Sequence, residues 1–198
     1  KDNPYNIGPV GGLGGRAANN ISKETDLVIA IGTKLGDFTT GSWANFENPN
    51  LKLICINTTR LDANKHLAQP IVSDAKLGIK KLSEILGDWK SQNSWIDKAR
   101  NDYKKWNKYI DDKIVPSNQK LPSYVQVIGA IYNKSDKTDI AVTAAGGLVG
   151  EALQVWRPRS LNTHETEWGF SCMGYEIAGA LGIKMAKPNQ EVIVFCGD

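Results

Sequence analysis

The sequence has no apolar run that approaches the ~18 consecutive residues of a membrane-spanning helix, and no signal-peptide pattern opens it. It also lacks a strong charge of either sign, because 24 Lys and Arg face 21 Asp and Glu, for a formal net charge of +3. So small an excess gives no reason to expect a nucleic-acid partner. These absences together predict a cytoplasmic protein that binds neither membranes nor nucleic acid.

Cysteine is scarce, with only Cys55, Cys172 and Cys196 in the chain. An odd number at wide spacings provides neither a disulfide framework nor the four ligands of a structural zinc site. Two of the three lie in apolar or small-residue runs, where buried free thiols are common. Cysteine usage therefore also favours a reducing, cytoplasmic setting.

Histidine is scarcer still, and the two residues, His66 and His164, are far apart in the sequence. Neither belongs to a paired metal-binding motif or to a hydrolase triad, and His66 is expected to be exposed. His164 is followed by Glu165 and Glu167, so one interpretation is a metal-binding or acid–base role. The spacing alone favours an exposed loop cluster.

What the sequence does contain is enough apolar material for a core, with 41% hydrophobic residues that include six Trp, six Tyr and four Phe among 198 residues. Short apolar runs at 26–32 and 51–57, and a shorter one at 71–72, are typical of buried parallel strands. A helix is predicted over 74–86 from its apolar spacing. Strand, loop and helix alternate, which favours an open α/β sheet.

Residues 88–120 combine aromatic and basic side chains. One interpretation is a nucleic-acid surface. However, Trp95, Ala99, Tyr103, Trp106 and Ile110 recur at steps of three and four, so they share one helical face. The spacing therefore favours an amphipathic connecting helix that packs against a neighbouring layer, and prolines bracket a linker at 116–122.

A second α/β unit follows the linker. Ser123 can cap a helix, and residues 139–144 read as a strand that ends in a small-residue turn at 145–147. A helix is predicted over 174–187 and a buried strand over 191–196. The chain begins at Lys1, not Met, and stops directly after this strand, so we expect it to be a piece of a longer polypeptide.

Two glycine-rich segments could bind phosphate. The cluster at 11–15 could form a backbone cradle, but no convincing strand precedes it and no acid is placed to hold a ribose. A nicotinamide cofactor is therefore disfavoured.

The second segment is Gly197-Asp198, directly past a strand at the carboxyl edge where α/β sheets bind ligands. The Gly146-Gly147 turn ends a neighbouring strand there, so a phosphate-bearing cofactor could span both, with Asp198 binding Mg²⁺. An ordinary strand-ending turn is the equal alternative.

At this point the sequence resembles the thiamine-diphosphate enzymes. Gly197-Asp198 matches the start of their Gly-Asp-Gly-Ser motif, and residues 171–182 resemble the stretch that precedes that motif. Within the superfamily, the resemblance is to the trihydroxycyclohexane-dione hydrolases of inositol catabolism. It rests on residues 172–176, on 146–148 followed by Glu151 and 156–158, and on 37–42.

The resemblance implies a fold and a domain organisation. A Rossmann-like parallel-sheet central domain, with its C-terminal connecting helix, is expected over 1–115. A linker follows at 116–122. Residues 123–198 would form the incomplete first part of a second α/β domain, which binds the diphosphate.

The resemblance also implies a cofactor site for thiamine diphosphate and Mg²⁺. Asp198 would be the first Mg²⁺ ligand, and Met173 would support the bent cofactor from its concave side, a place suited to a large flexible apolar side chain. The cofactor-binding residues are then Gly146, Gly147, Met173, Gly174 and Gly197. FAD is disfavoured because Lys34 stands where FAD-binding relatives have Arg, and no catalytic residue is assigned.

The implied reaction is the hydrolytic cleavage of a carbon–carbon bond in a cyclic polyhydroxylated 1,2-dione. In this family the active site forms between two subunits, so the full-length protein is expected to be a homo-oligomer, a dimer or a tetramer. The glutamate that activates the cofactor belongs to an N-terminal domain, so we expect these 198 residues alone to be inactive and to bind the cofactor weakly or not at all.

Two alternatives remain open at this stage. One is an acetolactate-synthase-like enzyme or carboligase, and the other is a non-catalytic remnant or interface module. The sequence also departs from the family pattern, because His164 lies one place early. The resemblance therefore assigns no part in substrate recognition to His164, whereas Glu167 matches.

Overall fold

The structure is a computed structural model that describes residues 3–167 and 169–197. It divides into two compact units, one formed by Val10–Tyr103 and the other by Lys104–Asp198 together with Lys1–Pro9. Each unit has its own three-stranded sheet, and in both sheets every strand pairing is parallel. The predicted α/β fold class is confirmed.

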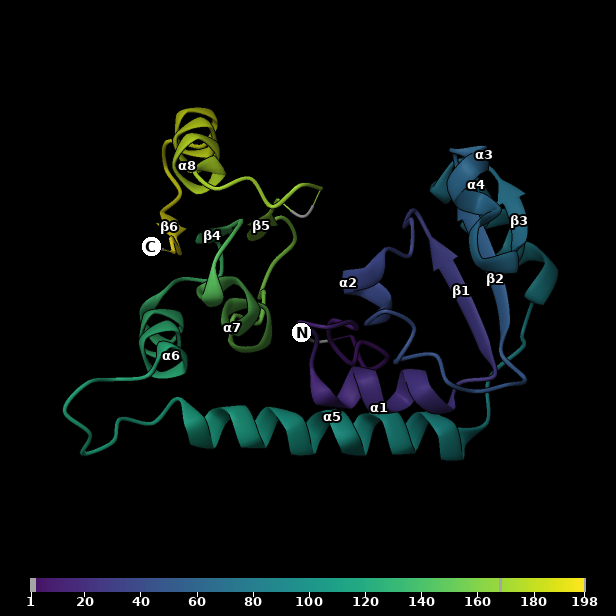
Figure 1. Ribbon diagram of the computed structural model, residues 1–198, viewed down its shortest axis with the longest axis horizontal. Helices are drawn as coiled ribbons and strands as arrows, with labels where there is room; N and C mark the ends of the chain where they lie inside the picture. The colour runs from purple at the N-terminus through teal and green to yellow at the C-terminus, as the bar shows by residue number, and fades with distance from the viewer. Residues whose placement is uncertain (1–2, 168, 198) are drawn as a thin grey trace. The chain divides into compact units, whose positions relative to one another are not determined.

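The unit Val10–Tyr103 has a sheet with the strand order β1-β2-β3 (Figure 1). All three strands fall where short apolar runs predict them. The elements of this unit are α1 (Arg16–Glu24), β1 (Leu27–Ile31), α2 (Asp37–Thr40), β2 (Lys52–Asn57), α3 (Arg60–Ala63), η1 (Lys65–Leu67), β3 (Gln69–Val72), α4 (Ala75–Leu86) and the first part of α5 (Asn93–Lys113).

The helix predicted over 74–86 forms as α4. It begins after Asp74, whose carboxylate accepts the backbone N–H groups of Lys76 and Leu77 at 2.9 and 3.2 Å, so the first turn is capped. Gly78 lies against Ile56 of β2, and a Cβ at this glycine would stand 2.7 Å from the Ile56 side chain. The missing side chain lets α4 pack closely on the sheet.

The second unit contains a sheet with the order β5-β4-β6. Its α6 begins with a capping box, in which Ser123 and Gln126 each bond the other's backbone N–H, as Ser123 predicts. The elements are the last part of α5, α6 (Tyr124–Lys134), β4 (Ile140–Thr143), α7 (Gly147–Val155), β5 (His164–Thr166), α8 (Tyr175–Ala186) and β6 (Val192–Val194).

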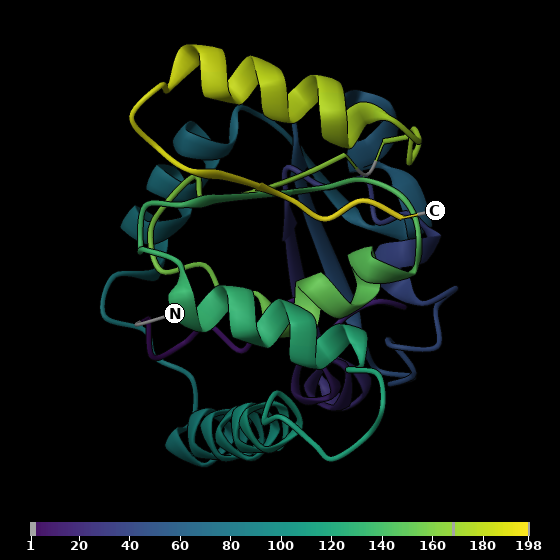
Figure 2. The same ribbon diagram turned by 90° about the vertical axis from the view of Figure 1, so that its left-hand side faces the viewer.

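Helices cover both faces of this second sheet. In Figures 1 and 2, α8 lies on one side of the strands and α6 and α7 lie on the other. Side chains alternate accordingly along β4, since Ile140 and Val142 pack with α8 and Ala141 packs with α6 and α7. Trp156 anchors the second layer through edge-to-face contacts with Tyr132 and Phe195.

The structure corrects the expectation that His164 lies in an exposed loop. Residues His164–Thr166 form strand β5, which pairs with Ala141–Thr143 of β4, and His164 is half-buried. Three residues are too few for a periodicity to be recognised in the sequence. The register with β4 creates this strand.

Two further expectations are only partly met. Cys55 is buried, but Cys172 and Cys196 are exposed, so the expectation of buried thiols is met by Cys55 and not by a second cysteine. The strand predicted over 191–196 spans only Val192–Val194.

The amphipathic segment forms the long helix α5. Of the five residues predicted to share a face, Ile110 is buried and the other four are half-buried, which confirms the packing interpretation. Among the helices that the structure describes, none combines the length and the apolar character that a bilayer-crossing segment needs.

Candidate functional site

The candidate site lies at the carboxyl edge of sheet β5-β4-β6, where Gly146 and Gly197 follow β4 and β6 and meet. A Cβ built on Gly146 would stand 3.1 Å from the Gly197 Cα, and one built on Gly197 would stand 3.2 Å from the Gly146 Cα. Gly146 has φ 98° and ψ 175°, a conformation that essentially only glycine adopts. The structure thus brings together two residues that the sequence assigned to one site.

The N-terminus of α7, which is the positive end of the helix dipole, lies at this turn. Gly146 is the N-cap and Gly147 the first residue of this nine-residue helix, both are exposed, and no described side chain caps the helix. The first N–H groups of a helix have no partner within it and carry partial positive charge. A helix start reached through a glycine turn is a suitable place for a phosphate group.

Glu176 connects this turn to the start of α8. Its carboxylate accepts the N–H of Ala145 at 2.9 Å and the N–H of Gly174 at 3.0 Å. The residue is only 2% exposed, and these backbone hydrogen bonds, the one from Ala145 foremost, lower the pKa of its carboxyl. An ionised, buried carboxylate therefore fixes two of the predicted segments to each other.

Met173 and Gly174 lie on the loop that leads into α8. Glu167 accepts the N–H of Phe170 at 2.9 Å and that of Cys172 at 2.8 Å. These bonds, with that from Cys172 the strongest, lower the pKa of the Glu167 carboxyl. Met173 is 87% exposed, so its side chain is free to contact a ligand.

Gly146 and Gly197 are therefore in direct contact. Glu176 connects Gly174 to Ala145, the residue before Gly146, and Gly147 follows Gly146 in the sequence. Asp198, the predicted Mg²⁺ ligand, lies outside the described residues. Within the described residues no group of three or more His, Cys, Asp or Glu side chains could hold a metal ion.

The structure also assigns a role to Glu176 that sequence reasoning missed. The sequence offered its place in the segment 172–176 and a carboxylate in the first turn of a predicted helix, and neither signal indicates a hydrogen-bond partner. Its partner Ala145 is far away in the sequence, and only the fold brings the two together.

His164 belongs to a chain of polar groups on the same sheet. Its Nε2 lies 3.2 Å from the Thr166 hydroxyl, which in turn lies 2.7 Å from the hydroxyl of the fully buried Thr143. Burial lowers the pKa of His164 to about 4. The imidazole is therefore neutral near pH 7 and suited to hydrogen bonding, not to charge pairing.

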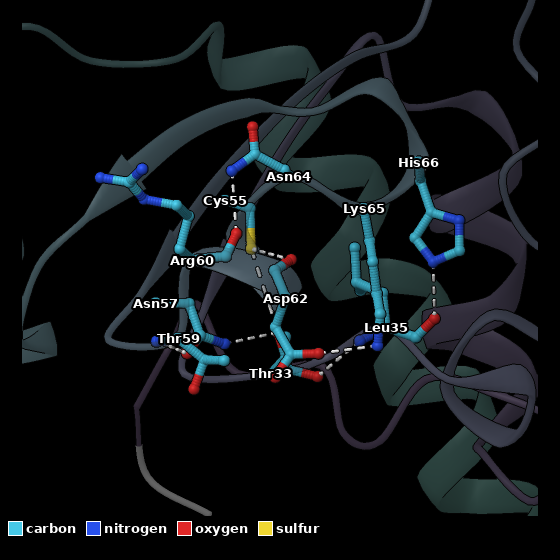
Figure 3. A network of polar contacts seen from close by, with 10 residues as sticks. All are labelled: Thr33, Leu35, Cys55, Asn57, Thr59, Arg60, Asp62, Asn64, Lys65 and His66. Atoms are coloured by element: carbon cyan, nitrogen blue, oxygen red, sulfur yellow. Dashed lines mark hydrogen bonds and ion pairs between the residues drawn. The ribbon is translucent and has the colours of Figure 1, made fainter.

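The other sheet has its own polar network at the carboxyl ends of β1 and β2 (Figure 3). The Asn57 side chain donates to the Thr33 carbonyl at 3.2 Å, and the Cys55 sulfur lies 3.6 Å from the Asp62 carbonyl. Burial, and secondarily the charge of Asp62, raises the pKa of the Cys55 thiol. These groups bind one another across the two strand ends, and Cys55 is a structural thiol.

His66 lies beside this network and contacts the backbone of Leu35 (Figure 3). Its Nε2 lies 3.2 Å from the Leu35 carbonyl, and its ring packs edge-on against Trp43 with centroids 4.4 Å apart. The residue is exposed, as expected. Its contacts connect loops and assign it no chemical role.

The glycine cluster at 11–15 does not form an open phosphate cradle. The N–H of Gly11 donates to the Asn19 side chain, that of Gly12 to the Phe38 carbonyl, and that of Gly14 to the Gly11 carbonyl. Gly11 has φ 126°, and a Cβ there would stand 2.1 Å from the Phe38 carbonyl oxygen. Close backbone packing therefore explains Gly11.

Comparison with family models gives two matches. Residues 1–82 match the model described as "Thiamine pyrophosphate enzyme, central domain", and residues 144–198 match "Thiamine pyrophosphate enzyme, C-terminal TPP binding domain". The second match covers the glycine turn, the Met173 loop and the last strand. The two models together cover most of the chain.

Individual relatives carry one name. The chain is 37% identical to a 3D-(3,5/4)-trihydroxycyclohexane-1,2-dione hydrolase of Bacillus anthracis and 35% identical to the protein of that name from Geobacillus thermodenitrificans. Each alignment covers 98% of this chain and 34% of the relative. The chain thus spans about a third of the length of the curated relatives that it matches.

Proposed function

Since this chain belongs to the thiamine pyrophosphate enzyme family, we propose that it binds thiamine diphosphate together with Mg²⁺ at the carboxyl edge of sheet β5-β4-β6. Thiamine diphosphate is another name for thiamine pyrophosphate. The bound cofactor would serve an enzyme that cleaves a carbon–carbon bond of a cyclic polyhydroxylated 1,2-dione by hydrolysis.

The observation that carries the binding proposal is the contact between Gly146 and Gly197. A side chain on either glycine would meet the backbone of the other, so both positions must be glycine for these two segments to meet beside the exposed N-terminus of α7. The exposed backbone N–H groups at Gly146 and Gly147 are accessible to a diphosphate, and the helix end favours its negative charge. The residues present therefore fit the group.

The residues assigned to the site would then have distinct physical roles. The backbone N–H groups at Gly146 and Gly147 would bind the diphosphate, and Asp198 would bind Mg²⁺ through a carboxylate oxygen. The Met173 side chain would contact the cofactor as an adaptable apolar support. When bound, the cofactor would supply a nucleophilic carbon that adds to a carbonyl, and a cationic ring that takes up the electron pair of the adjacent bond as it breaks.

The reaction class rests on the relatives, which are named as dione hydrolases.

We further infer a homo-oligomer in the cytoplasm. Ile177, Leu181 and Met185 expose an apolar stripe along α8, which supports burial of this face in an assembly. The three free cysteines support the reducing compartment.

The binding proposal is tested by nuclear magnetic resonance on the chain labelled at its methionine methyl groups. The chain has two methionines, so the Met173 methyl reports on the site and the Met185 methyl is an internal reference. Thiamine diphosphate with Mg²⁺ should shift the Met173 signal with weak, saturable affinity, and thiamine without the diphosphate should not. Equal responses to both compounds would contradict diphosphate recognition.

The reaction class needs a separate experiment, because an acetolactate-synthase-like carboligase is the competing function. The matching segment of the Bacillus anthracis relative is replaced by this chain, and the chimera is assayed for dione hydrolysis and for carboligation of pyruvate. Hydrolysis supports the proposal, and carboligation supports the alternative. A folded chimera that binds the cofactor but catalyses neither reaction favours a non-catalytic module.

A further inference from the structure

Two carboxylates bracket Met173 in the sequence, and both bind the backbone around it. Glu167 accepts the N–H groups of Phe170 and Cys172, and Glu176 accepts the N–H of Gly174. The residues on either side of Met173 are thus each fixed by a hydrogen bond. Met173 itself is 87% exposed, so packing of its side chain does not hold it in place.

Both residues are also tied to the end of β4, Glu167 through its backbone and Glu176 through its carboxylate. The Glu167 N–H donates to the Thr143 carbonyl at 3.2 Å, and the Glu176 carboxylate accepts the Ala145 N–H at 2.9 Å. The loop with Met173 is therefore joined at both ends to the end of the central strand. Glu176 alone reaches the glycine turn that precedes α7.

The charge state strengthens this arrangement. Backbone N–H donors lower the pKa of both carboxyl groups, so both are ionised near pH 7. Hydrogen bonds to an ionised acceptor are about twice as strong as neutral ones. An amide side chain could accept at one oxygen only and would direct its own donor at the other N–H.

We propose that Glu167 and Glu176 are positioning residues that hold Met173 against bound thiamine diphosphate by fixing the backbone on its two sides. This inference rests on the proposed function. Glu176 has a second task, because it also fixes the turn at Ala145 and Gly146 where the diphosphate would bind. The hydrogen bonds that the structure describes for Glu167 go to the Met173 loop and to β4.

Because of this difference, the roles of Glu167 and Glu176 can be distinguished by measuring the binding of two ligands. Magnesium pyrophosphate tests the diphosphate turn, and thiamine diphosphate with Mg²⁺ tests the turn and Met173 together. Glu167→Gln should weaken binding of thiamine diphosphate about tenfold and leave binding of magnesium pyrophosphate unchanged. Glu176→Gln should weaken binding of both, and Glu191→Gln, an exposed carboxylate of the same unit, should change neither.

A measurement without any ligand tests the hydrogen bonds themselves. Amide hydrogen exchange in the 198-residue chain should become about tenfold faster at one or both N–H donors of the replaced carboxylate, Phe170 and Cys172 in Glu167→Gln and Ala145 and Gly174 in Glu176→Gln. The Met185 methyl signal shows that each variant is folded. If Glu176→Gln does not fold, Glu167→Gln decides the question.

The outcomes separate the inference from the function on which it rests. Unchanged exchange at both donors of each carboxylate overturns the proposed hydrogen bonds. Faster exchange with an unchanged ratio of the two ligand affinities in Glu167→Gln shows a purely structural role and also overturns the proposal. If neither the wild-type chain nor its chimera with the Bacillus anthracis relative binds either probe, the proposed function fails, and with it the cofactor part of the inference, while the exchange data still decide the backbone contacts.

Discussion

Gly146 and Gly147 are neighbours with opposite tolerance for a side chain. Gly146→Ala would place a Cβ 3.1 Å from the Gly197 backbone at φ 98°, whereas the nearest atom to a Cβ at Gly147 is 3.9 Å away, in the Tyr124 ring. We expect Gly146→Ala to lower the free energy of unfolding by about 1–3 kcal/mol and to abolish diphosphate binding.

Gly147→Ala is the matched control. It should leave the free energy of unfolding within about 0.5 kcal/mol of the wild type. Urea denaturation and pyrophosphate titration measure both quantities. Equal effects of the two substitutions would show that the glycine contact does not shape the turn.

His164 should make stability depend on pH. Its pKa is about 4 in the folded chain against 6.5 for the ordinary side chain, so between these values the unfolded state binds a proton that the folded state does not. This contribution is fully present above pH 6.5 and is lost as the pH falls to 4. The loss amounts to about 3 kcal/mol.

Denaturant unfolding of the wild type and of His164→Gln at pH 7 and pH 4.5 measures this contribution. The variant should lose less stability on acidification, and His66→Gln, at an exposed position, should behave like the wild type. Identical pH dependence in wild type and His164→Gln would mean that the imidazole is solvated.

At the scale of elements, α6 offers a direct test of a sequence-based assignment. Ser123 accepts the N–H of Gln126 at 3.3 Å, and the Gln126 side chain accepts the Ser123 N–H at 2.9 Å. Ser123→Ala should cost about 1 kcal/mol of stability. Ser117→Ala, in a segment without helix or strand, is the control, and thermal unfolding followed by circular dichroism compares them.

The elements that were predicted share a strong local signal. Strands β1 and β2 are continuous apolar runs, α4 begins at a capping aspartate, and α6 begins at a capping serine. Helix α7 was missed because its glycines resemble a turn, and β5 was missed because it has three residues. Both elements depend on packing against β4, which local sequence does not reveal.

At the scale of the whole molecule, the family resemblance is confirmed by the matches to the central and C-terminal domains. It was drawn from residues 37–42, 146–148, Glu151, 156–158 and 172–176. The domain boundaries and the cofactor residues stay predictions. The resemblance places the glutamate that activates the cofactor in a further domain, and the matched models are of other domains.

We therefore expect no turnover when the 198-residue chain is incubated with thiamine diphosphate, Mg²⁺ and the dione. The Bacillus anthracis relative, assayed under the same conditions for consumption of the dione, is the positive control. Turnover that rises in proportion to the concentration of the pure chain would contradict this expectation.

The amino-acid sequence alone determined the α/β class, most strands and the family, because apolar runs, capping residues and short motifs are local features. It also named the glycines of the candidate site by resemblance. Only the tertiary structure decided that Gly146 meets Gly197, that Glu176 joins Ala145 to Gly174, and that His164 is half-buried in a strand. These contacts depend on the order and register of β5, β4 and β6, which bring together residues that are distant along the chain.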